Sequence, residues 1–170
     1  MTDGSRDAGF GERTPNPPSR LPALLLSTAL GVGYIPFAPG TFGSAAGLLL
    51  WALLPPSPSV QALTIVALFV GGSWSATAAE RHFGRADPGQ VVIDEVMGML
   101  ITLFMNPVGW AGALGGFFLF RVADVIKPYP ANRLERLHGG LGVMADDAMA
   151  AVYANLALRV TLVLSNWIIG

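Results

Sequence analysis

The chain has 170 residues, enough for one domain, and 52% of them are strongly hydrophobic against only 12% charged. A soluble domain carries about 25% charged residues, so residence in a membrane is the simplest explanation for the deficit. The net charge of −1 leaves no basic stripe for nucleic acid, which excludes a nucleic-acid partner. The lack of cysteine excludes disulfides, iron–sulfur clusters, thiolate zinc sites and a cysteine nucleophile.

Composition divides the chain into a polar tail and an apolar remainder. Residues 1–20 are polar and proline-rich, which predicts a disordered tail before one helical domain over residues 21–170. Breakers at 55–59 and 106–109 interrupt the apolar stretches. The pattern predicts an all-α, compact, membrane-embedded bundle of about five to six helices, some of them short or broken. The helices are expected near residues 42–54, 60–80, 94–105, 109–127 and 145–169, with a further one near 20–33.

The lengths of these helices indicate how the bundle meets a bilayer. A spanning helix needs about 20 residues, and Val60–Ala79 and Ala148–Ile169 are long enough. The apolar arms flanking Asn106-Pro107 have only about 10 to 12 residues, or about 15–18 Å, which predicts a hairpin that returns to the face it entered. A single span over 96–120 is the competing interpretation. The hairpin places both groups of charged residues on one side, and their cations make that side cytoplasmic by the positive-inside rule.

Five carboxylates stand in apolar surroundings near the ends of the predicted helices. Burying each charge costs about 2.5–3.5 kcal/mol, so the set costs on the order of 12–17 kcal/mol, comparable with the whole stability of a domain. A hard divalent cation would offset that cost, and Mg²⁺ is held by few carboxylates plus a substrate phosphate. The expected metal ligands and catalytic acids or bases are Asp94, Glu95, Asp124, Asp146 and Asp147. The alternative is that Asp146 and Asp147 cap a helix and Asp124 pairs with a neighbouring cation.

Two cations lie close to one of these acids. Arg121, Asp124 and Lys127 recur at every third position, which brings Arg121 beside Asp124 and Asp124 beside Lys127 on one side of a helix. Arg121 can bind a phosphate through two N–H groups, and Lys127 can act on it as a point charge. The alternative is that both side chains anchor the helix at lipid headgroups.

Two glycine-rich segments hold further candidates. The turn at residues 36–44 leads into an apolar helix, so Thr41 or Ser44 can bind substrate phosphate at the helix N-terminus or simply cap the helix. His138 precedes Gly139-Gly140 and is a candidate general acid for the leaving alkoxide. A loop histidine without such a role is the alternative there.

Four motifs follow one another with natural spacing between about Leu30 and Tyr153. They are Gly33–Ser44, Ile93–Met99, Phe120–Pro130 and His138–Asp147. Taken together, they resemble the phosphatidylglycerophosphatase A family. The resemblance implies an all-helical enzyme of the bacterial inner membrane that needs Mg²⁺ and removes the terminal phosphate from phosphatidylglycerophosphate, giving phosphatidylglycerol. Two departures, Ile93 for a frequent Trp and Ala150-Ala151 for a usual Gly, touch no carboxylate.

We expect water to attack phosphorus in line while the cation, Arg121 and Lys127 neutralise the phosphate. A phospho-aspartate is the other route, although the Asp-x-Asp pattern of haloacid-dehalogenase-type phosphatases is absent. Two other classes of function remain. One is a cation transporter or channel with the acids along an ion path, for which no paired inverted repeats are evident. The other is a non-catalytic membrane scaffold, which leaves five costly carboxylates unexplained. The oligomeric state and the number of metal ions stay open.

Overall fold

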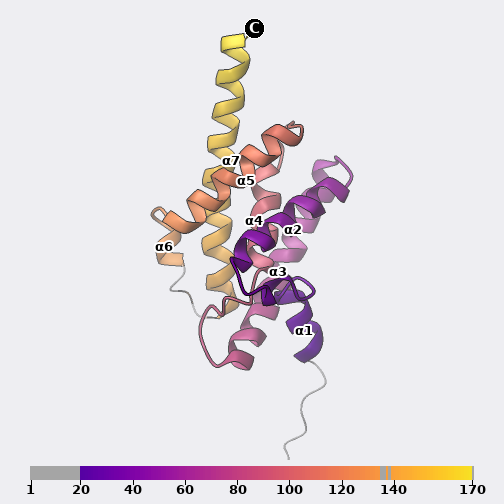
Figure 1. Cartoon of the computed structure of the whole chain (residues 1–170), viewed down its shortest axis with the longest axis vertical. Coiled ribbons are helices and arrows are strands. Elements are labelled where there is room, and N and C mark those ends of the chain that lie inside the picture. The colour runs from indigo at the N-terminus through magenta and orange to yellow at the C-terminus, as the bar shows by residue number, and fades with distance from the viewer. Residues whose placement is uncertain (1–19, 135–136, 138, 170) are drawn as a thin grey trace, which may run out of the picture.

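The structure, a computed structural model, describes residues 20–134, 137 and 139–169. Within these residues it is all-helical (Figure 1), which confirms the predicted fold class. The helices of eight or more residues are α1 (Arg20–Ser27), α2 (Pro39–Leu53), α3 (Pro58–Phe83), α4 (Ile93–Leu103), α5 (Trp110–Ile126) and α7 (Gly140–Ile169). A 3-10 turn, η1 (Val32–Tyr34), and the four-residue α6 (Ala131–Leu134) complete the described helices. The predicted tail lies outside the described residues, except for Arg20, which begins α1.

Left-handed backbone sets the limits of the first two helices. Residues 29–31 all have positive φ, which a right-handed helix does not accommodate, so the helix predicted near 20–33 ends early and is followed only by η1. Ala38 also has a left-handed backbone, and Pro39 then begins α2, where its missing N–H has no helical partner to lose. Helix α2 therefore starts three residues earlier than predicted, with Gly40 and Thr41 in its first turn.

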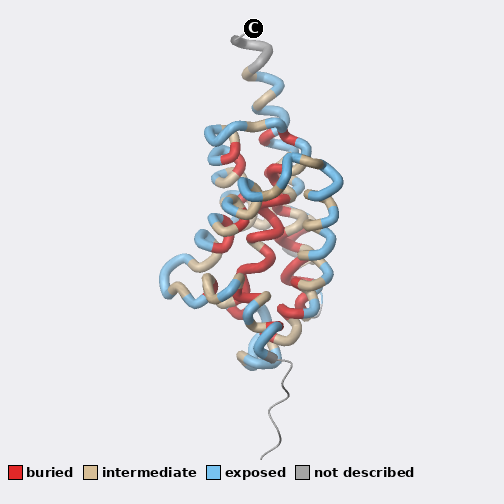
Figure 2. The backbone as a smooth tube through the Cα atoms, turned by 90° about the vertical axis from the view of Figure 1, so that its right-hand side faces the viewer, coloured by how far each residue is buried: buried red, intermediate tan, exposed pale blue. Residues whose placement is uncertain are grey.

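Helices α4 and α5 form the predicted hairpin, and the single-span interpretation is wrong. The chain is non-helical between Leu103 and Trp110, and Arg121 Nη1 near the end of α5 lies 3.9 Å from Glu95 Oε1 at the start of α4. Helix α4 runs through the buried middle of the bundle (Figure 2), packed against α2, α3, α5 and α7. The approach of α2 is close: a Cβ added at Gly47 would lie 2.6 Å from the carbonyl oxygen of Val96.

The C-terminal end of α4 is capped by a side chain of α7. The Asn155 amide nitrogen donates hydrogen bonds to the carbonyl oxygens of Ile101, Thr102 and Phe104 at 3.0, 3.0 and 2.8 Å. Asn106, itself buried, donates to Thr102 as well, at 3.1 Å. The last carbonyls of a helix have no partner within that helix, and an apolar interior offers no water to replace one. Asn155 therefore ties the tip of the hairpin to α7.

Replacing Asn155 with leucine is expected to lower the free energy of unfolding by about 1–2 kcal/mol, because the two N–H groups that the amide shares among the three carbonyls are lost, at about 1 kcal/mol each. Unfolding of the purified protein in detergent gives the measurement. Thr161→Val is the matched control on the same helix, since the exposed Thr161 hydroxyl donates to Ala157 one turn away. Equal stability of the two variants would contradict the capping role.

Two of the described helices, Pro58–Phe83 and Gly140–Ser165 within α7, are long and apolar enough to cross a membrane. Only 22% of each apolar window is buried inside the bundle, and the other residues are exposed or of intermediate burial (Figure 2). Helix α7 starts at Gly140 and not near 145, which places Asp146 and Asp147 about two turns inside the helix. The interpretation of these two acids as helix caps is therefore wrong.

Candidate active site

A cavity of about 380 Å³ lies at the end of the bundle where α4 begins. Its wall is formed by the first turn of α2, the loop before α4, the last turns of α5 and the N-terminal part of α7. The charged residues that line it are Asp87, Asp94, Glu95, Arg121, Asp124, Lys127, Asp146 and Asp147. All five predicted acids and both predicted cations thus meet in one place, because the hairpin brings the two charged segments together.

Three of the acids gather most closely. One carboxylate oxygen from each of Asp94, Glu95 and Asp147 lies within 4.8 Å of the other two. Glu95 Oε2 and Asp147 Oδ2 are buried and have no hydrogen-bond partner among the described residues. Buried carboxylate oxygens without partners are costly, and a divalent cation with oxygen ligands would supply the missing interactions. The three residues therefore fit a metal ion of the Mg²⁺ type.

The electrostatics of α4's first turn support the same interpretation. Burial raises the pKa of Asp94 well above its ordinary value, and the neighbouring Glu95 charge raises it further. Burial also raises the pKa of Glu95 to about 7, with Asp147 and Asp124 adding to the rise while the Asp94 hydrogen bond and the Arg121 charge oppose it. Keeping both carboxyls ionised requires added positive charge, which a bound cation provides.

The two remaining predicted acids, Asp124 and Asp146, form ion pairs with the two basic side chains of the cavity. Asp124 Oδ2 lies 2.8 Å from Arg121 Nη1, which confirms the pairing predicted from their spacing. Lys127 Nζ lies 2.6 Å from Asp146 Oδ2, a partner that spacing did not predict. Lys127 follows the last residue of α5 with a left-handed backbone, so helical spacing no longer governs its direction. The Arg121 and Lys127 side chains remain 21% and 27% exposed, which leaves both open to a ligand.

The two residues predicted to bind phosphate in the turn at 36–44 have different positions in the structure. Thr41 lines the cavity in the first turn of α2, as its prediction requires. Ser44 is fully buried: its hydroxyl donates to the Gly40 carbonyl at 2.9 Å and accepts from Arg121 Nη1 at 3.4 Å. Its position thus suits holding Arg121 in place and not direct contact with substrate. His138 lies outside the described residues.

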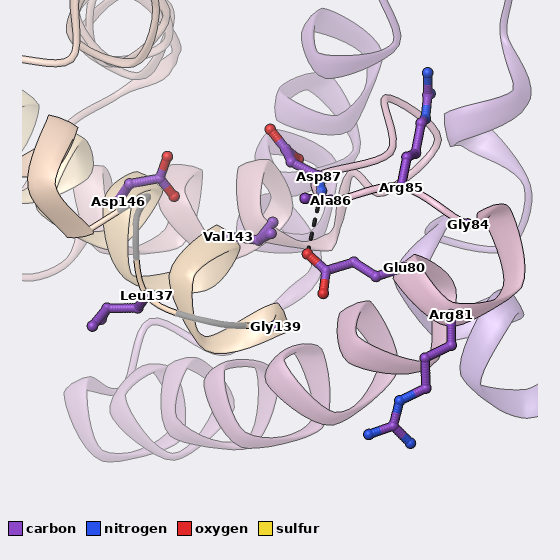
Figure 3. Close-up of a pocket in the computed structure, with 10 residues that line it drawn as sticks. All are labelled: Glu80, Arg81, Gly84, Arg85, Ala86, Asp87, Leu137, Gly139, Val143 and Asp146. Atoms are coloured by element: carbon purple, nitrogen blue, oxygen red, sulfur yellow. Dashed lines mark hydrogen bonds between the residues drawn. The ribbon is translucent and has the colours of Figure 1, made fainter.

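The sequence interpretation missed Asp87. This residue has a left-handed backbone with φ of 42°, and its N–H donates to Glu80 Oε1 at 3.2 Å (Figure 3). Asp87, Val143 and Asp146 line both the charged cavity and an adjoining one of about 840 Å³. The available signal was an acid in an Asp-Pro-Gly turn shortly before Asp94, a pattern that indicates only a turn.

Clustered carboxylates beside an ion-paired arginine and lysine, within an all-helical apolar fold, define a site for a phosphorylated ligand and a hard cation. A family model described as Phosphatidylglycerophosphatase A matches residues 25–162, and the chain therefore belongs to the phosphatidylglycerophosphatase A family. This membership confirms the resemblance found in the motifs. The chain is a phosphatase, a phosphoric monoester hydrolase of phospholipid metabolism.

Individual relatives agree with the family and differ in their named substrates. Phosphatidylglycerophosphatase A of Escherichia coli K12 is 36% identical over 77% of this chain and 78% of its own. The Haemophilus influenzae protein of that name is 37% identical over 78% and 84%. A Bacteroides thetaiotaomicron protein named as a candidate phosphatidylinositol-3-phosphatase is 36% identical over 90% of this chain and 98% of its own. No solved structure matches the chain.

Replacing Gly40 with alanine is expected to lower phosphate release by about tenfold with little change in stability. The added Cβ would collide with Glu95 Oε1 and lie 3.1 Å from Arg121 Nη2. Both are ends of flexible side chains, so they move aside and lose their positions while the fold persists. Rates and unfolding temperatures of purified variants test this. Gly115→Ala is the control, since nothing lies within 4 Å of its added Cβ; equal rates in both variants would be contrary to the expectation.

Proposed function

We propose that this chain is a Mg²⁺-dependent lipid phosphatase that hydrolyses phosphatidylglycerophosphate to phosphatidylglycerol and phosphate, a step of phospholipid synthesis. The observation that carries the proposal is the meeting of three close carboxylates with Arg121 and Lys127 in one cavity. The family description and the names of two relatives support the choice of substrate.

The residues divide into three roles in this proposal. Asp94, Glu95 and Asp147 would hold the cation, which supplies Lewis-acid charge to the phosphoryl oxygens when bound. Arg121 and Lys127 bind the phosphate oxygens and offset the charge of the transition state. Asp124 and Asp146 orient the Arg121 and Lys127 side chains through the ion pairs described above, so the positions of both basic groups are set before substrate binds.

Hydrolysis then proceeds by in-line attack of water on phosphorus. The new P–O bond forms as the bond to the glycerol oxygen breaks, one proton leaves the water, and one proton reaches the leaving alkoxide. Asp146 Oδ1 is the candidate acceptor of the water proton, since it is buried, has no partner among the described residues, and lies outside the close trio. His138 stays a prediction as the donor to the alkoxide. Trapping of a phospho-aspartate on denatured enzyme would instead favour the covalent route.

We also propose a multi-pass arrangement in the bacterial inner membrane with the cavity toward the cytoplasm. Helices α3 and α7 have the length to span, and the cavity lies at the end of the bundle where α3 ends and α7 begins (Figure 1). Exposed Arg81, Arg85 and Arg133 lie near that end, as the positive-inside rule requires. A single cysteine placed at Arg85, in a chain that otherwise has none, should react with an impermeant reagent only in inside-out vesicles.

Phosphate release from defined lipids tests the function. We expect release from phosphatidylglycerophosphate that stops with chelator and returns with Mg²⁺. Phosphatidylinositol-3-phosphate is the second candidate substrate, because the Bacteroides relative named for that activity is matched over 98% of its length. A higher rate with phosphatidylinositol-3-phosphate than with phosphatidylglycerophosphate would make the inositol lipid the substrate of this enzyme. Release from neither lipid, together with cation flux in vesicles, would support the transporter alternative, which the family membership does not favour.

A further inference from the structure

The mouth of the charged cavity carries exposed apolar residues on two sides. Ala38, before α2, and Val125, in the last turn of α5, both line the cavity and are exposed, Val125 by 76%. Both are close to the phosphate-binding arginine: Val125 follows Arg121 by about one helical turn, and a Cβ on Gly40 would lie 3.1 Å from Arg121 Nη2. The cavity therefore opens between the start of α2 and the end of α5.

The apolar surface continues outward from this mouth. Phe37, next to Ala38 in the chain, is 79% exposed. On α5, Val122 and Ile126 are 56% and 69% exposed, and Val122 lies beside both Val125 and Ile126, because residues three and four apart are neighbours on a helix. We call Phe37, Ala38, Val122, Val125 and Ile126 the apolar lip. Exposed apolar residues on both sides of a charged cavity mark a place where an apolar ligand or lipid meets the protein.

We propose that the apolar lip binds the acylglycerol part of the phospholipid substrate, which reaches the cavity sideways from the bilayer between α2 and α5. The inference rests on the proposed function and adds where the acylglycerol part of the substrate, which does not react, is bound. A phospholipid phosphomonoester has a doubly charged end and an apolar end joined by a short polar link. Val125, the lip residue of α5 that lines the cavity, lies about 6 Å from Arg121 along the helix axis, so both ends are accommodated at once.

The adjoining cavity is the alternative place for the lipid tails, and its lining argues against it. Its charged lining residues are Glu80, Arg81, Arg85, Asp87 and Asp146, and Figure 3 shows Glu80 and Asp87 joined by their hydrogen bond near its middle. Acyl chains placed there would desolvate charged groups without pairing them, which is unfavourable. The adjoining cavity therefore suits water, and the acyl chains occupy the lip.

Selectivity between a long-chain lipid and a water-soluble phosphomonoester tests the lip. The probes are phosphatidylglycerophosphate in mixed micelles and glycerol 3-phosphate in solution, and the readout is the ratio of their kcat/KM values. Phe37→Gln and Val125→Gln are each expected to lower this ratio about tenfold, because each removes an apolar contact that only the lipid makes. Leu63→Gln is the matched control: Leu63 is 71% exposed and lies on α3, a helix that contributes no residue to the lining of the charged cavity.

The outcomes separate the lip from the function on which it depends. A lower ratio in both lip variants with a wild-type ratio in Leu63→Gln supports the lip. An unchanged ratio, equal loss of both activities, or an equal fall in the Leu63 variant overturns it. Failure of the wild-type chain to release phosphate from any lipid phosphomonoester would instead overturn the proposed function, and the inference with it.

Discussion

Replacing Asp147 with asparagine is expected to lower phosphate release by on the order of 10³-fold. Asp147 is only 4% exposed, its Oδ2 has no partner among the described residues, and it is the α7 member of the close carboxylate trio. The amide keeps the shape of the side chain but removes the negative charge that a divalent cation requires. Binding of Mn²⁺, a paramagnetic substitute for Mg²⁺, should weaken in parallel and is measured by electron paramagnetic resonance without any substrate.

Stability distinguishes this loss from misfolding. In the absence of divalent cations, Asp147→Asn is expected to unfold at the same or a higher temperature than wild type, because it removes a buried charge beside other carboxylates. Asp7→Asn makes the same chemical change outside residues 25–162, the part matched by the family, and should leave both rate and Mn²⁺ binding unchanged. Wild-type turnover together with wild-type Mn²⁺ affinity in Asp147→Asn would remove this residue from the metal site.

Replacing Arg121 with alanine is expected to lower kcat/KM by about 10²–10³-fold. Its Nη1 lies 2.8 Å from Asp124 Oδ2, 3.4 Å from Ser44 Oγ and 3.9 Å from Glu95 Oε1, so three helices hold the guanidinium at the cavity. Arg121→Lys should recover only part of the loss, because an ammonium cannot form two parallel hydrogen bonds with phosphate. Steady-state phosphate release from both variants gives the comparison.

Arg133→Ala provides the matched control for Arg121. The Arg133 guanidinium stacks over the Tyr129 ring with 5.0 Å to its centroid, and Arg133 does not line the cavity. Its loss should leave kcat/KM within about twofold of wild type, as expected for an exposed side chain. Full activity in Arg121→Lys would show that charge alone suffices, and equal losses in the Arg121 and Arg133 alanine variants would point to a general effect of lost positive charge.

Most of the acidic residues of the candidate site could be predicted from the sequence, because a buried charge is costly wherever it occurs in an apolar chain. That cost singled out the five acids without any knowledge of their contacts, and the spacing of Arg121 and Asp124 predicted their ion pair. Asp87 escaped the same reasoning because it is exposed in a polar turn, where an acid costs nothing. The role of Ser44 escaped because a serine at a helix start is equally consistent with a cap and with a ligand contact.

The sequence by itself determined the all-helical class and the positions of the breakers, since periodicity, composition and proline act locally. It left a hairpin and a single span over 96–120 both open, and the structure decided for the hairpin. Only the tertiary structure decided which acids meet. Asp94, Glu95 and Asp147 gather into a metal-compatible trio, while Asp124 and Asp146 pair with cations. These contacts depend on helix ends and packing: α7 begins before its predicted start, and Lys127, just past the end of α5, pairs with Asp146 of α7. Interactions between residues far apart in the chain follow from that packing and leave no local signal.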